Sequence, residues 1–545
     1  MQPVNDEADA FARSRGWACA EVFLLLLLFF VFAGWPPPDA NEAHYLCKAK
    51  NYWNPEWCAE DLFLSSSDAH VVFYWTFGWL TLFAPLGAVA WIGRLLTWTL
   101  LAWTWRRLSV SLAPRPFVSL VTAAIMMTCL ERLHLAGEWI IGGVEAKGFA
   151  YALVFLALEA IVRGAWRHVW WLLGVATAFH VLVGGWSVVA AAFAWVAVGR
   201  RESPLREQLA PLAIGGAVAL LGVVPALALS GHSEPAARTA AHWVYVYERL
   251  SHHLVIHRFP HAFMARHLAL LFVWLAVALA MRGEERIRRL HAFVAGAVLI
   301  AALGVVIDQS SLTNLEFAAS LLRFYWYRLS DAMLPIGFAL GAVALLLQWA
   351  QSPTVRVSRS ARAGMLLLAA VASGNILAAH VRGRTDLRPR GVKLPLAQTP
   401  LTAEQSSDRF RDWRNVCGWI KQNTPGEAVF LTPRRQQTFK WYAERAEVVN
   451  WKDVPQDADT LLEWRRRVRV VYPRKVILRG FGAWSDDRIA AIANRFGATY
   501  VVDDAQRSRR LLNFPRVYPT GGEQNGTFRV YYIAPVILRP TVQPK

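Results

Sequence analysis

Acidic side chains are concentrated in the stretch that follows the first apolar segment of the chain, DANEAHYLCKAKNYWNPEWCAEDLFLSSSDAH. Asp39 and Glu42 stand at its start, and Asp68 and His70 stand at its end, before the next apolar segment. A carboxylate at a membrane boundary is partly desolvated, which raises its pKa toward that of a useful general base. We therefore expect proton-transfer chemistry here. Helix capping by Asp39, or plain solvation of single side chains, is the alternative.

A second polar stretch, HLAGEWIIGGVEAKGFAYA, carries ionisable groups at the mouth of another apolar segment. Glu145 and Lys147 follow a pair of glycines, and Glu138 is nearby in the sequence. An ionisable pair this close to hydrocarbon predicts a functional site. The alternative is that Lys147 only extends its charged end toward the interface.

A third stretch, LLRFYWYRLSDAMLP, sets Arg323, Arg328 and Asp331 among aromatic residues. The planar fork of a guanidinium matches two oxygens of a phosphate group. An aromatic belt with an arginine paired to Asp331 would explain the same residues without a ligand. If the three stretches face one aqueous boundary, their carboxylates and arginines could receive the phosphate of a lipid head group.

Apolar segments are the elements that must position these groups. Hydrophobic residues make up 55% of the 545 residues, and the mean hydropathy is +0.28. They are gathered in blocks, several of which reach the roughly 20 residues that a membrane-spanning helix needs. We count about eleven spans, and arginine-rich loops alternate with them as cytoplasmic loops do. The chain is therefore expected to be a polytopic α-helical membrane protein with a C-terminal soluble α/β domain.

The order of the spans predicts the topology. Arg13 and Arg15 precede the first span, residues 17–35, which places the N-terminus in the cytoplasm. We interpret this span as a retained anchor, with a cleaved signal peptide as the alternative. The second span is expected at residues 71–92, with the following LLTWTLLAWTW in the membrane interface. An odd number of spans places the C-terminus outside, and the expected location is a bacterial inner membrane.

The tail has a different character from the rest of the chain. Residues 1–380 form the multi-pass domain, 381–405 a basic linker, and 406–545 an exoplasmic or periplasmic domain. Alternating helices and short apolar runs predict an α/β fold for that domain. The expected helices are 408–422, 457–468 and 486–496, and the expected strands are 428–432, 447–451, 498–502 and 528–533.

Charge and cysteine content narrow the choice of partners and cofactors. The net charge of +19 is explained by cytoplasmic loops and by a tail suited to an anionic membrane surface, so no nucleic-acid partner is expected. Cys47 and Cys58 share the first outside loop and could form a disulfide in an oxidising compartment, but their spacing leaves the pairing open. No metal site is assigned. Asp39, Asp61 and Asp68 carry the hard oxygen ligands that Mg or Mn prefers, so a divalent cofactor stays open.

Five short motifs resemble the GT-C superfamily of polytopic glycosyltransferases. They are DANEAHY and EDLFLSSSDAH in the first outside loop, and CGWIKQNTPGEAVFLTP, FKWYAERAEVVNW and FGATYVVDD in the tail. The resemblance covers the layout of nearly the whole chain, but the tail has no W-W-D-Y-G-type motif of the oligosaccharyltransferase subgroup. It implies membrane lipid as a partner and transfer of a sugar from a polyprenyl-phosphate donor to an acceptor hydroxyl.

The resemblance also implies roles for particular residues. Asp39 is the first candidate for the general base, and Glu42 is the second or orients the acceptor. Arg323 and Arg328 would stabilise the phosphate leaving group, with help from Lys147. Further candidates for substrate binding are Glu145, Asp331, His70 and Asp68.

Two other classes of protein remain open. One is a transporter or lipid-handling protein, for which a short hairpin around Gly184 and Gly185 could supply a broken-helix site. The other is a membrane-anchored binding or assembly module without catalysis. The charges stand at the ends of the spans and not in their middle, which favours chemistry at the boundary over conduction.

Overall fold

The computed structural model describes residues 14–231, 233–385, 388–392, 401–508, 510–521 and 524–534. The chain divides into two compact units, each built from separate segments. Unit 1 comprises residues 1–34, 68–75 and 91–384, and unit 2 comprises residues 35–67, 76–90 and 385–545. Arg13 and residues 386–387 and 393–400 of the expected linker lie outside the described residues. Most of the first outside loop therefore folds with the tail, in unit 2.

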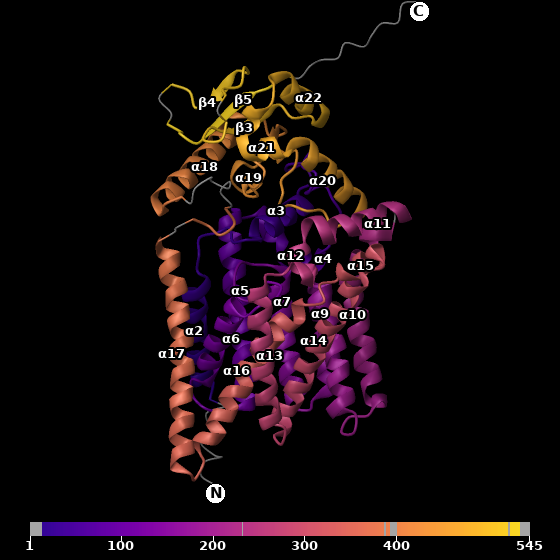
Figure 1. Ribbon diagram of the computed structural model, residues 1–545, viewed down its shortest axis with the longest axis vertical. Helices are drawn as coiled ribbons and strands as arrows, with labels where there is room; N and C mark the ends of the chain where they lie inside the picture. Colours follow the sequence, from indigo (N-terminus) through magenta and orange to yellow (C-terminus); the bar gives the residue numbers. More distant parts are fainter. Residues whose placement is uncertain are drawn as a thin grey trace, which may run out of the picture. The chain divides into compact units, whose positions relative to one another are not determined.

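Unit 1 is a bundle of long helices (Figure 1). Within the described residues, eight helices are long and apolar enough to span a membrane. They are α2 (Arg15–Ala33), α5 (Leu86–Leu112), α9 (Val181–Ala194, continued to Gly199 by a π turn), α10 (Leu205–Gly231), α13 (His261–Ala280), α14 (Glu285–Ser310), α16 (Arg328–Ala350) and α17 (Val355–Thr385). Three shorter apolar helices join them: α6 (Val118–Arg132), α7 (Ala146–Val162) and α8 (Trp166–Phe179). The expected fold class is confirmed.

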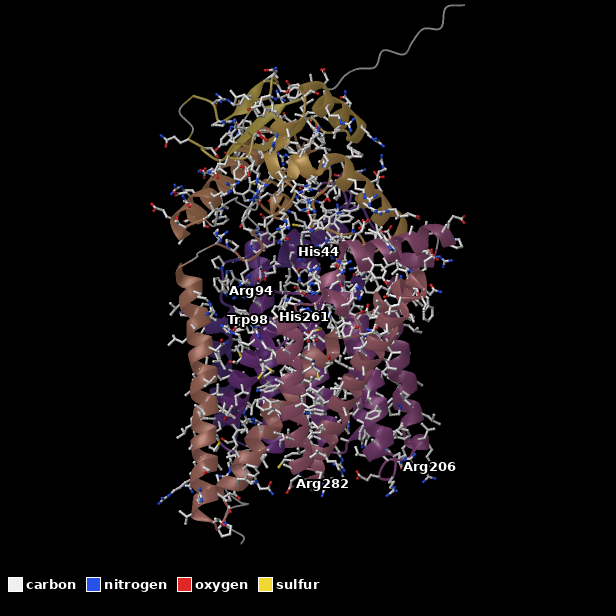
Figure 2. All side chains as sticks on the ribbon, viewed as in Figure 1. His44, Arg94, Trp98, Arg206, His261 and Arg282 are labelled. Atoms are coloured by element: carbon white, nitrogen blue, oxygen red, sulfur yellow. The ribbon has the colours of Figure 1, made fainter. Side chains whose placement is uncertain are left out.

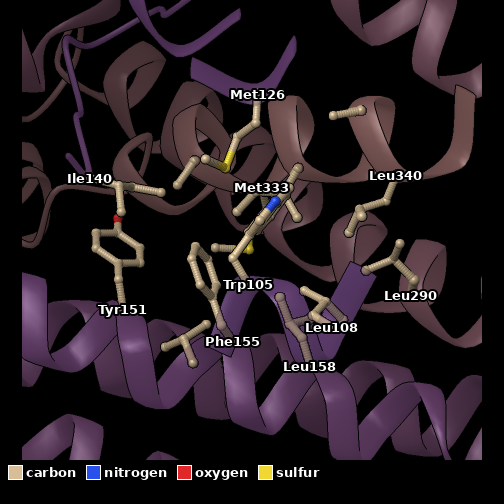
Figure 3. Packing of buried hydrophobic residues seen from close by; sticks show 14 of the residues in the cluster. Trp105, Leu108, Met126, Ile140, Tyr151, Phe155, Leu158, Leu290, Met333 and Leu340 are labelled. Carbon is tan, nitrogen blue, oxygen red and sulfur yellow. The ribbon is translucent and has the colours of Figure 1, made fainter. Parts of the chain in front are cut away.

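Helix α16 occupies the centre of the bundle, because 89% of its most apolar 18-residue stretch is buried, whereas only 11% of the corresponding stretch of α10 is buried. Figure 3 shows Met333 of α16 near Trp105 of α5 and Phe155 of α7, and Leu340 of α16 near Leu290 of α14. The rings of Trp105 and Phe155 lie 5.4 Å apart. Outer helices such as α10 and α17 instead expose leucine side chains, as surfaces that face lipid do. The rigid centre thus carries α16, whose first turn holds Arg328 and Asp331.

The expected second span is wrong in its position. Residues 71–92 form two short helices, α4 (Val71–Thr76) and η1 (Gly78–Leu82), and then the start of α5. Pro85 separates the two regions, since proline is favoured at the start of a helix and disrupts its interior. The stretch expected in the interface is the interior of α5, where Trp98 Nε1 donates a hydrogen bond to the carbonyl of Gly142 at 2.9 Å.

The expected hairpin is also displaced. Helix α8 ends at Phe179 and α9 begins at Val181, so the break falls at His180, and both glycines lie inside α9. The Nδ1 atom of His180 accepts a hydrogen bond from the backbone N–H of Val183. A Cβ atom on Gly184 would lie 2.2 Å from the backbone nitrogen of Thr177, so only glycine allows this close approach of α8 and α9. Gly184 therefore serves packing, a Cβ atom on Gly185 would meet nothing within 4 Å, and neither glycine breaks the helix.

The two ends of unit 1 differ in chemistry. Arg206 and Arg282 lie at the same end of the bundle, whereas His261 lies toward the other end (Figure 2). Helix α13 runs from His261 toward Arg282, and α14 returns to the His261 end. The short elements α11 (Pro235–Trp243), η3 (Val244–Arg249), α12 (Ser251–Leu254), η4 (Ile256–Arg258) and α15 (Leu315–Leu322) lie between spans. Helix α16 therefore starts, with Arg328, at the end opposite to the arginine-rich loops.

Unit 2 contains a five-stranded mixed sheet with the order β2-β1-β3-β5-β4. Its strands are β1 (Val429–Leu431), β2 (Ala446–Glu447), β3 (Tyr500–Asp504), β4 (Arg516–Tyr518) and β5 (Phe528–Tyr532). Strands β2, β1 and β3 are parallel, and β5 pairs antiparallel with both β3 and β4. The helices are α18 (Ala403–Asn423), α19 (Phe439–Ala443), α20 (Ala458–Val471), α21 (Arg474–Arg479), η5 (Phe481–Ala483) and α22 (Asp486–Phe496). The α/β fold expected for the tail is confirmed.

The first outside loop contributes helix α3 (Glu42–Trp53) to unit 2. Lys48 of this helix is buried, and its Nζ donates hydrogen bonds to the carbonyls of Phe63 at 3.1 Å and Leu64 at 2.7 Å. These bonds satisfy carbonyls that burial would otherwise leave without partners. The loop is thus folded around Lys48.

Candidate functional site

Glu138, in the loop between α6 and α7, lies between two cations of unit 1. Its Oε1 atom is 3.2 Å from Nζ of Lys147, and its Oε2 atom is 2.7 Å from Nε of Arg328. The hydroxyl of Tyr151 lies 3.4 Å from Oε1. We call Glu138, Glu145, Lys147, Arg328 and Asp331 the Glu138 cluster. Both cations thus converge on one group that offers two oxygen atoms.

Asp331 fixes the loop that carries Glu138. Its Oδ1 atom accepts a hydrogen bond from the backbone N–H of Leu135 at 2.6 Å, and its Oδ2 accepts one from Ala136 at 2.8 Å and one from Glu138 at 3.2 Å. The side chain is fully buried in the first turn of α16. The alternative predicted an arginine paired with Asp331, but Arg328 pairs with Glu138. Asp331 holds the loop in place by accepting hydrogen bonds from its backbone N–H groups.

Lys147 stands in the first turn of α7, where Glu145 precedes it. Its Nζ lies 3.7 Å from Oε2 of Glu145 and 3.8 Å from the centre of the Trp139 ring. Only 6% of the side chain is exposed, so Lys147 does not extend into solvent as the interfacial alternative would require. Arg328, at 21% exposure, is the more accessible cation and stacks on Tyr325 at 3.9 Å. Four of the expected site residues, Glu145, Lys147, Arg328 and Asp331, therefore belong to one cluster.

Other expected residues of unit 1 have different neighbours. Nη1 of Arg323 lies 2.6 Å from Nε2 of His242. Burial, helped by the charge of Arg323, lowers the pKa of His242 to about 4, so the imidazole is neutral and accepts this hydrogen bond. The His70 ring lies 5.4 Å from the ring of His180, and Asp68 is half-buried in the turn that precedes α4.

Asp39 and Glu42 belong to unit 2. The Oε2 atom of Glu42 accepts a hydrogen bond from the backbone N–H of Asp39 at 2.7 Å, and Oδ1 of Asp39 accepts one from Ala40 at 2.7 Å. Asp39 is 4% exposed and Glu42 is fully buried. The two carboxylates therefore organise the entrance to α3, and their catalytic roles stay predictions.

Unit 2 contains another buried ionic group, which the sequence did not predict as a site. Nζ of Lys440, on α19, lies 3.2 Å from Asp61, 2.8 Å from Glu447 and 2.8 Å from Asp453. We call these four residues the Lys440 cluster. All four side chains are at most 2% exposed, so one ammonium holds three carboxylates away from water.

Titration of the Lys440 cluster follows from this geometry. Burial lowers the pKa of Lys440, but the three carboxylates outweigh burial and raise that pKa well above its usual value. Burial raises the pKa of Asp453, but Lys440 and a contact from His44 at 3.3 Å outweigh it and hold the pKa below its usual range. Burial also raises the pKa of Glu447, and Lys440 only partly offsets it. These shifts favour the charged forms of Lys440 and Asp453 and disfavour the charged form of Glu447.

Sequence reasoning missed this group because its members are far apart in the chain. Asp61 Oδ2 accepts a hydrogen bond from the backbone N–H of Glu447, 386 positions away, at 3.2 Å. In the tail, Lys440 was noted only within the motif FKWYAERAEVVNW, and Asp453 was not singled out. One local signal exists: Glu447 is an acidic residue at the start of an apolar run.

The residues named for a divalent ion do not fit such a site. The described parts of the chain contain no group of three or more His, Cys, Asp or Glu side chains that could hold a metal. Asp61 is instead held by Lys440 and by the backbone N–H groups of Phe63 and Leu64, at 3.1 and 3.0 Å. We derive no step through a metal. Cys47 and Cys58 are buried free thiols, and burial raises the pKa of both.

Comparison with known proteins gives one family match and several similar structures. A family described as a domain of unknown function (DUF6798) matches residues 411–471, a segment that contains Lys440, Glu447 and Asp453. No curated protein matches the chain.

The similar solved structures include two GT-C glycosyltransferases. One is the archaeal oligosaccharyltransferase AglB from Archaeoglobus fulgidus, in complex with an inhibitory peptide and a dolichol-phosphate, at 12% identity and a TM-score of 0.46. The match covers 90% of this chain and 69% of the AglB chain. The other is ArnT from Cupriavidus metallidurans bound to undecaprenyl phosphate, at 15% identity, a TM-score of 0.45, and 96% and 98% coverage. A third, the A. fulgidus oligosaccharyltransferase in complex with Zn and sulfate, is 10% identical with a TM-score of 0.45, at 89% and 68% coverage.

These structures belong to the superfamily that the sequence motifs resemble. Because their TM-scores lie below 0.5, the similarity carries no argument about the site or the reaction. The chemistry must be argued from the residues of this chain.

Proposed function

We propose that this chain is an integral-membrane glycosyltransferase that transfers a sugar from a polyprenyl-phosphate donor to an acceptor hydroxyl at the outer face of the membrane. The observation that supports it is the convergence of Lys147 and Arg328 on the two oxygens of Glu138, at the mouth of the bundle. A phosphate group offers the same two-oxygen geometry to a guanidinium and an ammonium. The donor class follows the sequence resemblance.

In this reaction the bond from the sugar's anomeric carbon to the phosphate oxygen breaks as the bond to the acceptor oxygen forms. Lys147 and Arg328 bind the phosphate in place of Glu138 and stabilise the negative charge that grows on it. Asp39 takes the proton of the acceptor hydroxyl, and Glu42 orients Asp39 or the acceptor. The products are the glycosylated acceptor and polyprenyl phosphate.

Replacing Arg328 with glutamine is expected to raise the KM for the donor about 10–100-fold, because a hydrogen bond to a charged group contributes about 1.5–3 kcal/mol. Transfer of a radiolabelled sugar from the polyprenyl-phosphate donor in membranes measures the change. Lys147→Met should act in the same direction. Arg258→Gln is the matched control, since Arg258 is exposed in the loop before α13. An unchanged KM in both cluster variants would remove them from donor binding.

The same assay separates an enzyme from the alternative classes. A transporter or lipid-handling protein would move the labelled lipid across proteoliposomes without breaking the bond to the sugar. A binding module would do neither. Release of labelled glycosylated acceptor is the result that supports the transferase.

The proposed orientation has the N-terminus in the cytoplasm of a bacterium and the tail outside the inner membrane. It is supported by Arg206 and Arg282, which share one end of unit 1, since cytoplasmic loops collect arginine. A periplasmic reporter enzyme fused after Lys545 is expected to be active, and a reporter that works only in the cytoplasm is expected to be silent. The opposite pair of results would invert the orientation.

A further inference from the structure

A pocket opens in the tail domain at the carboxyl ends of the adjacent parallel strands β1 and β3. Pro433, Arg434 and Arg435 follow β1, Asp503 and Asp504 end β3, and the free space in and before the pocket is about 540 Å³. The chain passes from β1 to β2 on one side and then to β3 on the other side of β1. Ligands of open α/β sheets bind where the strand order reverses in this way. We call it the β1–β3 pocket.

Asp503 is a buried polar group of this pocket that its protein neighbours do not satisfy. Its Oδ1 atom accepts hydrogen bonds from Ser508 Oγ and from the backbone N–H of Phe481, the latter at 3.2 Å. Oδ2 has no hydrogen-bond partner among the described residues, although the side chain is fully buried. Burial raises the pKa of Asp503 to about 6. A buried oxygen of this kind is costly unless a donor reaches it.

The pocket also has an excess of guanidinium groups. Arg435 forms no ion pair with a described residue, and Nε of Arg507 lies 3.6 Å from Oδ2 of Asp504. Burial lowers the pKa of Arg507, Asp504 partly offsets this effect, and the nearby charges of Arg409 and Arg435 add to the lowering. Asp504 is already paired with Arg409. An anion between Arg435 and Arg507 would relieve their repulsion.

The remaining walls are apolar and aromatic. Phe481, Val476 and Ile477 line them, and the hydroxyl of Tyr472 is engaged by the carbonyls of Thr432 and Val449 at 2.8 and 2.7 Å. Such walls suit the carbon face of a sugar ring and leave the polar contacts to Asp503 and the arginines.

We infer that the β1–β3 pocket binds a phosphorylated sugar, with the phosphate on Arg435 and Arg507 and a sugar hydroxyl donating to Oδ2 of Asp503. All of these residues lie in the tail, and none of them belongs to the Glu138 cluster. The inference therefore does not depend on the transfer reaction proposed above.

Calorimetric titration of the purified full-length protein with glucose 6-phosphate tests the inference, with glucose and inorganic phosphate as separate arms. Glucose 6-phosphate is expected to bind at least about tenfold more tightly than either fragment, because both halves of the pocket contribute. Arg435→Ala should weaken glucose 6-phosphate and phosphate alike by about tenfold, and Asp503→Asn should weaken glucose 6-phosphate by about fivefold but spare phosphate.

Two controls make the result specific. Arg474→Ala removes an exposed charge of the same domain outside the pocket and should leave binding unchanged, and Arg328→Gln in unit 1 reports any phosphate that binds at the Glu138 cluster instead. Absence of binding at millimolar concentration, or equal loss in Arg474→Ala, would overturn the inference. Loss in Arg328→Gln alone would move the phosphate to the Glu138 cluster and equally overturn it. Arg435 is half-buried and forms no ion pair within the described part of the chain, so its variant should fold even if Asp503→Asn does not.

Discussion

Replacing Asp39 with asparagine is expected to lower sugar transfer by about 10²–10⁴-fold, because the amide cannot accept the proton of the acceptor hydroxyl. The amide oxygen can still accept the hydrogen bond that Ala40 donates to Oδ1 of Asp39, so the entrance to α3 should keep its shape. Initial rates with a labelled polyprenyl-phosphate donor, in membranes matched for expression, measure the loss. The KM for the donor should change little, since the phosphate contacts are elsewhere.

Glu42 and Glu60 provide the comparison for Asp39. Glu42→Gln is expected to have a smaller effect, because Glu42 orients the base through the bond between its Oε2 and the Asp39 N–H. Glu60→Gln should have none, since Glu60 is exposed in the same loop. Normal turnover in both Asp39→Asn and Glu42→Gln, at normal expression, would reject these roles.

Replacing Lys440 with methionine is expected to destabilise unit 2 by about 3–5 kcal/mol, because removal of one partner leaves a buried ionic group uncompensated. Methionine preserves the length of the side chain, so loss of charge is the main change. Thermal unfolding and limited proteolysis of the purified protein at neutral pH would report it. Lys421→Met is the control, because its pair with Glu444 is half-exposed and such pairs contribute about 0–1 kcal/mol. A melting temperature equal to that of the control would contradict the prediction.

The Lys440 cluster should also make stability depend on pH. The pKa of Asp453 is lower in the folded chain than in the unfolded chain, because Lys440 and His44 outweigh burial. The contribution of Asp453 is therefore complete above its unfolded pKa and is lost as the pH falls through the folded one. Glu447, whose folded pKa is raised, opposes folding once the pH exceeds its unfolded value. The Lys440→Met variant should lose the acid-side dependence that comes from Asp453.

Elements with complete local signals could be predicted from the sequence. Helix α22 was expected at 486–496 and is found there, because the side chain of Ser485 caps its start and Gly497 adopts the left-handed conformation at its end. Strand β5 was expected to end one residue later than it does. Short strands such as β4, and short helices such as α19 and α21, carry too few residues for a recognisable pattern.

Hydropathy alone located the spans less well where an apolar segment does not cross the membrane as one continuous helix. Residues 71–83 are apolar but form short helices, and the buried Arg94 lies inside α5, where a charge suggested the end of a span. The glycine pair in α9 resembled a turn, yet both residues are helical and packing against α8 requires Gly184. In each case a tertiary contact decided the outcome, and a sequence pattern does not contain tertiary contacts.

The candidate site was predictable in part. Charges at the mouths of apolar segments pointed to Glu145, Lys147, Arg328 and Asp331, and the structure gathers these four residues in unit 1. Their hub, Glu138, was only noted as a neighbour in the sequence, because its partners come from α7 and α16 and not from its own loop. The Lys440 cluster was out of reach for the same reason on a larger scale.

The union of residues 35–67 with the tail has a consequence for how the chain is made. Asp61 leaves the ribosome 386 residues before the backbone N–H that it later binds on Glu447. At roughly 5–20 residues per second, tens of seconds pass in which the early segment has no partner to fold against. Its carboxylate must stay hydrated during that interval, while the spans are inserted one after another. In any chain that stops before residue 440, residues 35–67 would stay unfolded and exposed to quality-control proteases.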